Sequence, residues 1–169
     1  MKKWASVFLA ALTCFLADPS GAVSRVGGGK VRSQFSGFAL TIPSEYFRVE
    51  ASGENAVIAR GPMFFGSATG RIEAFIRISE FSTYFADAQD LTADQLEQRL
   101  SKSGWIRVHW QGTCEKVFKN ESGGVLSYVV TWGAGRGFVI NASKLEYSER
   151  SIAAMLASLE IEPGSCAWK

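Results

Sequence analysis

The single histidine is the strongest catalytic candidate in the sequence. His109 lies in the stretch "RVHWQ" and is the one histidine among 169 residues. Catalysis by a Ser–His or Cys–His pair needs a nucleophile beside the base and a third group that orients the base. No motif supplies those partners, and His109 alternates with Arg107 and Gln111 on the polar face of a predicted strand. We therefore expect no enzyme, while a hydrolase that uses His109 or a pair of carboxylates stays open as an alternative.

Two short stretches resemble nucleotide-binding and hydrolase motifs but lack essential residues. A phosphate-binding loop built on "GGGK" needs Gly where Ser24 stands and Ser or Thr where Val31 stands. A nucleophile elbow built on "FGSATG" needs Gly two residues before and two residues after the serine. Ser67 has Gly66 directly before it and Thr69 two residues after it. Neither motif predicts an activity, and no cofactor is expected.

Three acidic residues are the best candidates for metal ligands. Asp87, Asp90 and Asp94 are spaced so that their carboxylates could share a hard cation such as calcium. Acidic residues near the start of a helix also suit its dipole, which is the interpretation we favour. Zinc is not expected, because one histidine and two distant cysteines do not make a tetrahedral ligand set. We predict no metal site, and calcium stays open.

The first 22 residues have the character of a secretory signal. Lys2 and Lys3 precede an uncharged, mostly apolar stretch that is too short to span a bilayer, and small residues before Val23 favour cleavage after Ala22. Cys14 matches a lipoprotein signal poorly, so lipidation is an alternative only. We expect the mature protein in the periplasm or secreted, with residues 23–34 as a flexible lead-in and residues 35–169 as one domain.

The remaining cysteines predict a disulfide bond. Cys114 and Cys166 are the two cysteines that follow the signal, and an exported chain with two thiols is a candidate for oxidation. A bond between them would tie the C-terminal segment to the middle of the domain.

The charge balance argues against a nucleic-acid partner. After the signal the chain carries 16 basic and 15 acidic residues, and nucleic-acid binding needs a basic stripe. No later apolar run reaches the length of a membrane span. Another protein is therefore the expected partner.

Alternating runs separated by short turns predict an antiparallel sheet. In "RIEAFIRISEF" the residues Ile72, Ala74, Ile76 and Ile78 face one way, and Arg71, Glu73, Phe75, Arg77 and Ser79 face the other way. A capping box formed by Thr92 and Gln95 begins a helix over residues 93–102, and a second amphipathic helix is predicted over residues 149–158. The fold class is therefore α+β, with an antiparallel sheet of about seven or eight strands covered by two helices.

Apolar residues in loops are the best candidates for contacts with a partner. The Gly-rich stretch "GPMFFGSATG" holds Phe64 and Phe65, and Arg136 projects from the predicted turn "GAGRG". Packing against the core is the alternative for the two phenylalanines, and a solvated turn is the alternative for Arg136. A second aromatic group, Phe81, Tyr84 and Phe85, is expected to pack before the first helix.

The arrangement of elements resembles the PsbP-like fold family. A short strand that ends in Pro covers residues 37–43, and an amphipathic helix followed by a short strand covers residues 152–161. Between these two segments lie a meander, a capped helix and another meander. In size, compartment and layout the chain is similar to the family's periplasmic immunity proteins, which block toxins delivered by type VI secretion. The resemblance implies a non-catalytic protein that binds through its surface, with an envelope assembly subunit as the alternative.

Overall fold

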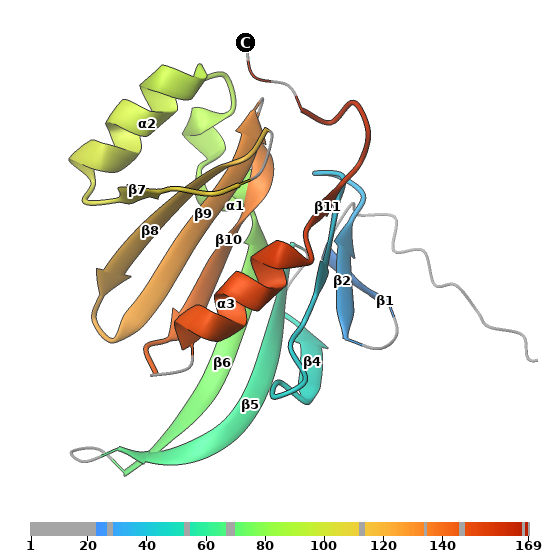
Figure 1. Ribbon diagram of the computed structural model, residues 1–169, viewed down its shortest axis with the longest axis vertical. Helices are drawn as coiled ribbons and strands as arrows, with labels where there is room; N and C mark the ends of the chain where they lie inside the picture. The colour runs from blue at the N-terminus through green and yellow to red at the C-terminus, as the bar shows by residue number, and fades with distance from the viewer. Residues whose placement is uncertain are drawn as a thin grey trace, which may run out of the picture.

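The described residues form two antiparallel sheets and three α-helices (Figure 1). The computed structural model describes residues 23–26, 29–52, 55–66, 70–111, 114–133, 135–145, 148–166 and 168. Within this part of the chain the larger sheet has seven strands in the order β4 (Arg48–Ala51), β5 (Ala56–Gly66), β6 (Gly70–Glu80), β10 (Arg136–Ser143), β9 (Val125–Gly133), β8 (Lys116–Ser122) and β7 (Ile106–Val108). The smaller sheet has the order β1 (Val23–Val26), β2 (Lys30–Ser33), β3 (Phe38–Thr41) and β11 (Glu160–Ile161). The predicted α+β class is confirmed, and the second sheet is an addition to it.

The smaller sheet corrects the flexible lead-in predicted for residues 23–34. Strands β1 and β2 form a hairpin, and β2 pairs with β3 from Lys30 opposite Thr41 to Ser33 opposite Phe38. The side chain of Val31 is buried. The segment contains few apolar residues, and for that reason the sequence predicted no regular structure in it. In the structure, the buried Val31 and the backbone pairing with β3 hold β2 in the sheet.

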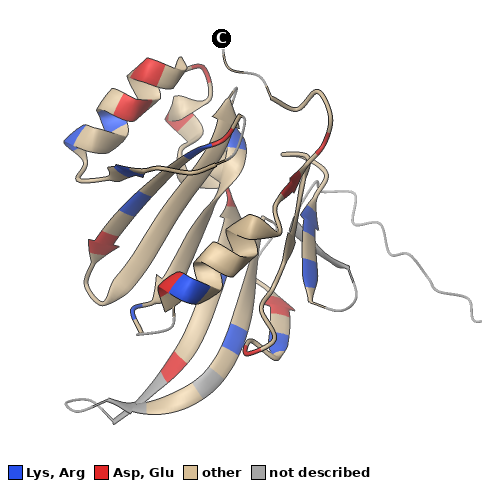
Figure 2. Ribbon diagram, viewed as in Figure 1, with Lys and Arg blue, Asp and Glu red and all other residues tan. Residues whose placement is uncertain are grey.

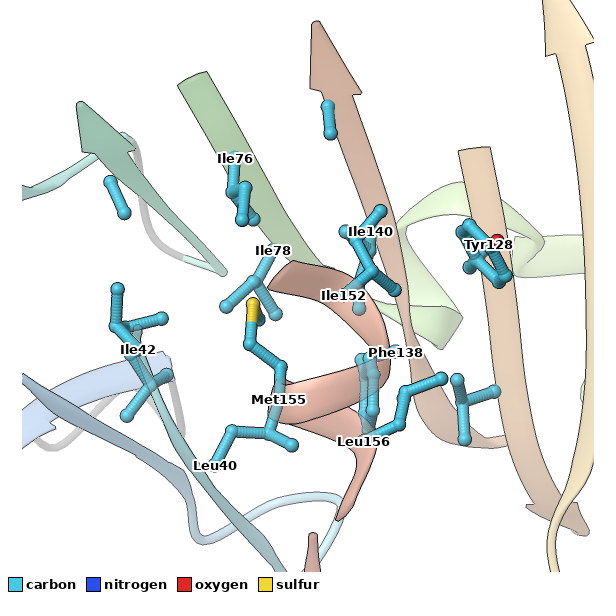
Figure 3. Packing of buried hydrophobic residues seen from close by; sticks show 14 of the residues in the cluster. Leu40, Ile42, Ile76, Ile78, Tyr128, Phe138, Ile140, Ile152, Met155 and Leu156 are labelled. Atoms are coloured by element: carbon cyan, nitrogen blue, oxygen red, sulfur yellow. The ribbon is translucent and has the colours of Figure 1, made fainter. Parts of the chain in front are cut away.

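Helix α3 (Ser148–Ala157) lies on one face of the larger sheet, which we call the inner face (Figure 1). Its buried residues Ile152, Met155 and Leu156 share one cluster with residues of both sheets. Figure 3 shows Met155 between Leu40 of the smaller sheet and Ile78 of the larger one. The helix predicted over residues 149–158 is thus confirmed, and its apolar face joins the two sheets into one core.

The other face of the larger sheet, the outer face, carries the remaining helices. They are α1 (Phe81–Tyr84), the single 3-10 turn η1 (Ala86–Ala88) and α2 (Ala93–Lys102). The predicted capping box of α2 is present: the Thr92 hydroxyl accepts from Gln95 N at 3.3 Å, and the Gln95 side chain accepts from Thr92 N at 2.9 Å. Leu96 and Leu100 of α2 are buried in a second cluster with Phe118 and Val129.

The predicted disulfide is present between Cys114 and Cys166, whose Cα atoms lie 6.1 Å apart. It holds the C-terminal segment beside strand β8. The Trp168 indole donates to Cys114 O at 2.8 Å, and Lys116 Nζ lies 5.3 Å from the centroid of the indole ring. Arg136 donates to Ser165 O at 3.3 Å. The bond is therefore one of several contacts that hold this segment.

A buried carboxyl lies where the two sheets meet. Glu80, the last residue of β6, is 1% exposed and accepts a hydrogen bond from the Ser36 hydroxyl. Ser36 also lies 3.2 Å from Gly137 O of β10. Burial raises the pKa of the Glu80 carboxyl, although hydrogen bonds from Ser33 and Ser36 oppose the increase. Its Oε1 atom has no hydrogen-bond partner among the described residues.

The helices formed by the described residues are all too short or too polar to cross a bilayer.

Candidate functional site

The outer face of the larger sheet divides into rows of residues that lie opposite one another on successive strands. One such row is covered by the helices, and we call it the covered row. It consists of Ser79, Val139, Val129 and Phe118, on strands β6, β10, β9 and β8 in turn. All four side chains are buried, and α1, η1 and α2 contribute Phe81, Ala88, Leu96 and Leu100 to the same cluster.

The next row on the same face is open to solvent, and we call it the open row. It consists of Glu50, Ile58, Arg77, Asn141, Ser127 and Asn120, on strands β4, β5, β6, β10, β9 and β8 in turn. Arg77 is exposed, and the other five side chains are partly exposed. Since side chains two residues apart on a strand point to the same face, the two rows are neighbours.

Hydrogen bonds fix the middle of the open row. The Ser127 hydroxyl donates to Asn141 Oδ1 at 2.8 Å. The Asn141 amide in turn donates to the Tyr84 hydroxyl at 3.0 Å. At the edge of the row, the Asn120 amide donates to Gly104 O at 2.9 Å. Because Tyr84 accepts from Asn141, its own hydroxyl hydrogen points elsewhere and is available to a partner.

The cations near the open row differ in how they are paired. Arg60 donates to both Glu50 and Glu73, and Arg48 lies 3.3 Å from Glu50. The hydrogen bond from Arg60 lowers the pKa of the Glu50 carboxyl. Arg77 forms no ion pair or hydrogen bond through its side chain with the rest of the described chain. Figure 2 shows basic and acidic positions interspersed on β4, β5 and β6.

Apolar side chains surround these polar groups. Phe75 precedes Arg77 by two residues on β6 and is partly exposed. Met63 is 52% exposed opposite Glu73, and Tyr84 is 49% exposed. Aromatic residues, methionine and arginine are enriched in protein–protein interfaces. In composition this surface therefore resembles a contact region.

The three binding residues predicted from sequence lie in two places. Phe64 pairs with Ile72 near the start of β6, and it is partly buried against the inner-face core. Arg136 begins β10 just beyond the end of β6, roughly 30 Å away along the strands, where it contacts the C-terminal segment. The side chain of Phe65 lies outside the described residues. The structure therefore does not bring Phe64 and Arg136 together.

His109, which only the alternative of a hydrolase would use, lines a cavity of about 320 Å³. Arg107, Trp110, Glu115 and Lys116 lie on its wall, and no serine or threonine belongs to the described part of the lining. Both Arg107 and Lys116 form ion pairs with Glu97 of α2.

Among the acidic candidates, Asp87 pairs with Arg99, whose hydrogen bond lowers the pKa of the Asp87 carboxyl. The described residues include no group of three or more His, Cys, Asp or Glu side chains placed to hold a metal. Calcium binding stays an untested alternative.

Sequence reasoning missed the residues that form the open row. Arg77 was placed on the polar face of its strand, but nothing distinguished it from Arg71 or Glu73. Tyr84 was expected to pack before the first helix. Pairing of β6 with β10 brings Arg77 next to Asn141, which holds Tyr84. The register of two strands distant in sequence carries this information, and a local pattern does not contain it.

Comparison of the chain with protein-family models, curated proteins and solved structures finds no match. The resemblance to the PsbP-like fold family therefore stays a prediction.

Proposed function

We propose that this protein is an exported, non-catalytic domain that binds another protein through the open row and the apolar residues beside it. The observation that carries the proposal is that Arg77 has no partner among the described residues and lies next to Asn141, which holds the exposed Tyr84. The exposed Met63 extends this surface to the position opposite Glu73, roughly 13 Å from Arg77 along β6. Arginine and aromatic side chains supply much of the binding energy of known interfaces. A partner that covers this surface would bury Met63 and Phe75 and provide an acceptor for Arg77.

The compartment forms part of the same proposal. The signal character of residues 1–22 and the Cys114–Cys166 bond support an oxidising, extracytoplasmic location. We propose the periplasm, reached after cleavage near Ala22.

For the partner we propose a secreted toxin, with this protein acting as its immunity protein. The support is the resemblance in layout to the PsbP-like family described above. The mechanism would be occlusion, in which the open row covers the active cleft of the toxin.

The test is coexpression in the periplasm with the product of the adjacent gene. We expect the two proteins to elute together in size-exclusion chromatography and the cells to survive expression of the toxin. The matched control is the variant Met63→Asp, which places a charge at an exposed apolar position of the proposed contact and should abolish both results. Survival without a complex would contradict binding, and a stable complex with an envelope protein would favour the assembly subunit instead.

A further inference from the structure

Among the described side chains on this part of the outer face, the guanidinium of Arg77 is the cation that is left for a partner. Arg60 already contacts two carboxylates, and Arg48 contacts Glu50. An arginine offers five N–H donors and accepts no hydrogen bond. Whatever binds at Arg77 must therefore supply acceptors, and two parallel acceptors satisfy its geometry best.

A second donor lies beside Arg77. Asn141 is directly opposite Arg77 on the neighbouring strand, and directly opposite residues have Cβ atoms about 4.5–5.5 Å apart. The Asn141 amide holds the oxygen of Tyr84 at 3.0 Å, which leaves the hydroxyl hydrogen of Tyr84 as a donor. Asn141 itself is occupied on both sides, by Ser127 and Tyr84. Its role is to position the Tyr84 hydroxyl, and it does not contact the partner.

Apolar groups flank the two donors. Ile58 lies opposite Arg77 on β5, and Phe75 precedes it on β6. Both side chains are partly exposed. A partner that covers them would exclude water from Arg77, and hydrogen bonds to a charged group are stronger where the local dielectric is low.

We infer that Arg77 and Tyr84 form a subsite for one acidic side chain, Asp or Glu, presented by the partner protein between apolar neighbours. Arg77 binds both oxygens of the carboxylate, and the Tyr84 hydroxyl donates to one of them. The inference rests on the proposed function for the partner being a protein, whereas the preference for a carboxylate follows from the donors alone.

The first experiment uses a short peptide as the probe. The full exported chain, labelled with ¹⁵N, is titrated with N-acetyl-Leu-Glu-Leu-amide and with its Gln twin, and the Arg77 Nε–H resonance is followed by NMR. We expect the Glu peptide to shift this resonance and to bind at least fivefold more tightly than the Gln peptide. Equal affinities would overturn the inference. So would an equally large shift with sodium acetate at the same concentration, because a small organic acid would then be sufficient as the ligand.

Substitutions of Arg77 and Tyr84 test whether these two residues form the subsite. A hydrogen bond to a charged group predicts a roughly 10- to 100-fold weaker affinity for the Glu peptide in Arg77→Ala. Arg77→Lys should recover part of the affinity, and Tyr84→Phe should weaken it a few-fold. The matched control is Arg48→Ala, which removes the same charge from the same face and should change the affinity less than twofold. Equal losses in Arg48→Ala and Arg77→Ala would mean that only net charge matters, which would overturn the subsite.

The two proposals fail in different ways. If the protein forms a complex with the product of the adjacent gene and Arg77→Ala does not weaken that complex, the subsite is wrong and the proposed function stands. If no complex forms but the peptide titration depends on Arg77 and on the carboxylate, the proposed function is wrong and the subsite stands.

Discussion

The covered row and the open row lie on the same face of one sheet, two residues apart, and they have opposite characters. The covered row presents valine and phenylalanine to α2, whereas the open row presents Arg77, Asn141 and Ser127 to solvent. The cover that α2 provides ends at the boundary between the two rows. Gly104, just beyond α2, accepts a hydrogen bond from Asn120 of the open row.

The two rows differ in which side chains they carry, and this difference supports different roles for them. A half-covered sheet could fill its open part with lysine and glutamate, which keep it solvated. The open row instead carries an asparagine and a serine whose side chains bond each other, and the asparagine holds the exposed Tyr84. On the proposed function, the covered row contributes stability and the open row contributes recognition.

The strongest test of this comparison is truncation in the covered row. Phe118→Ala should lower the free energy of unfolding by about 3–5 kcal/mol, because it leaves a cavity in a fully buried cluster. Urea denaturation followed by circular dichroism measures the change. The matched variant is Asn120→Ala, two residues along the same strand, where the loss of one hydrogen bond predicts about 1 kcal/mol. Similar losses in the two variants would remove the distinction between the rows.

Removal of the disulfide tests how much the C-terminal segment contributes to the stability of the cluster that contains the covered row. Trp168 packs at the edge of the covered cluster, and the bond closes a loop with a sequence separation of 52. Replacing both cysteines with serine should cost about 2–4 kcal/mol of unfolding free energy, through the entropy of the unfolded chain. Urea denaturation with and without a reductant measures this cost. An unchanged midpoint in the reduced wild-type protein would contradict the expectation.

Strand β6 allows a comparison of an exposed charge in the open row, Arg77, with a buried carboxyl three residues further along, Glu80. Arg77 is in solvent, while burial raises the pKa of Glu80 above its ordinary value of 4.5. The unfolded chain therefore loses its proton from Glu80 at a lower pH than the folded protein does. Stability should fall as the pH rises from about 4.5 until the folded carboxyl ionises.

Glu80→Gln should remove this dependence. We expect the variant to be at least as stable as the wild type at pH 7 and little different at pH 4, as measured by urea denaturation across that range. Parallel pH profiles for the two proteins would show that the pKa of Glu80 is not raised in the fold.

The smallest effect on stability is expected in the open row itself. Arg77→Ala removes an exposed side chain with no partner among the described residues, so the free energy of unfolding should change by no more than about 0.5 kcal/mol. Thermal and urea denaturation measure this change. A loss that approaches the loss in Phe118→Ala would mean that Arg77 has a structural role, and the open row would then not be specialised for recognition.

Local patterns were sufficient to predict the elements with strong periodicity. The capping box at Thr92, the apolar stripe of α3 and the alternation of β6 each depend on residues within a few positions of one another. The pairing of Cys114 with Cys166 was also predictable, because the sequence predicts an exported chain, and two thiols in one chain have one way to pair.

The division of strands into two sheets was not predictable in this way. The pattern of β3 shows that it is buried, but it does not reveal that its neighbours are β2 and β11. The exposure of Met63 and the partial burial of Phe64 follow from a shift in register between Arg60 and Met63. Gly61 lies at that shift, where a Cβ atom would come within 3.2 Å of Ala74 Cβ. In sequence the same stretch resembles a flexible loop.

The smaller sheet joins the earliest and latest described segments of the chain. Strand β11 pairs with β3, and Lys30 bonds Glu160 across a separation of 130 residues. During synthesis, β2 and β3 leave the ribosome long before the strand that completes their sheet. We therefore expect nascent chains that stop short of Glu160 to remain sensitive to protease, so that acquisition of the native fold is a late, post-translational event.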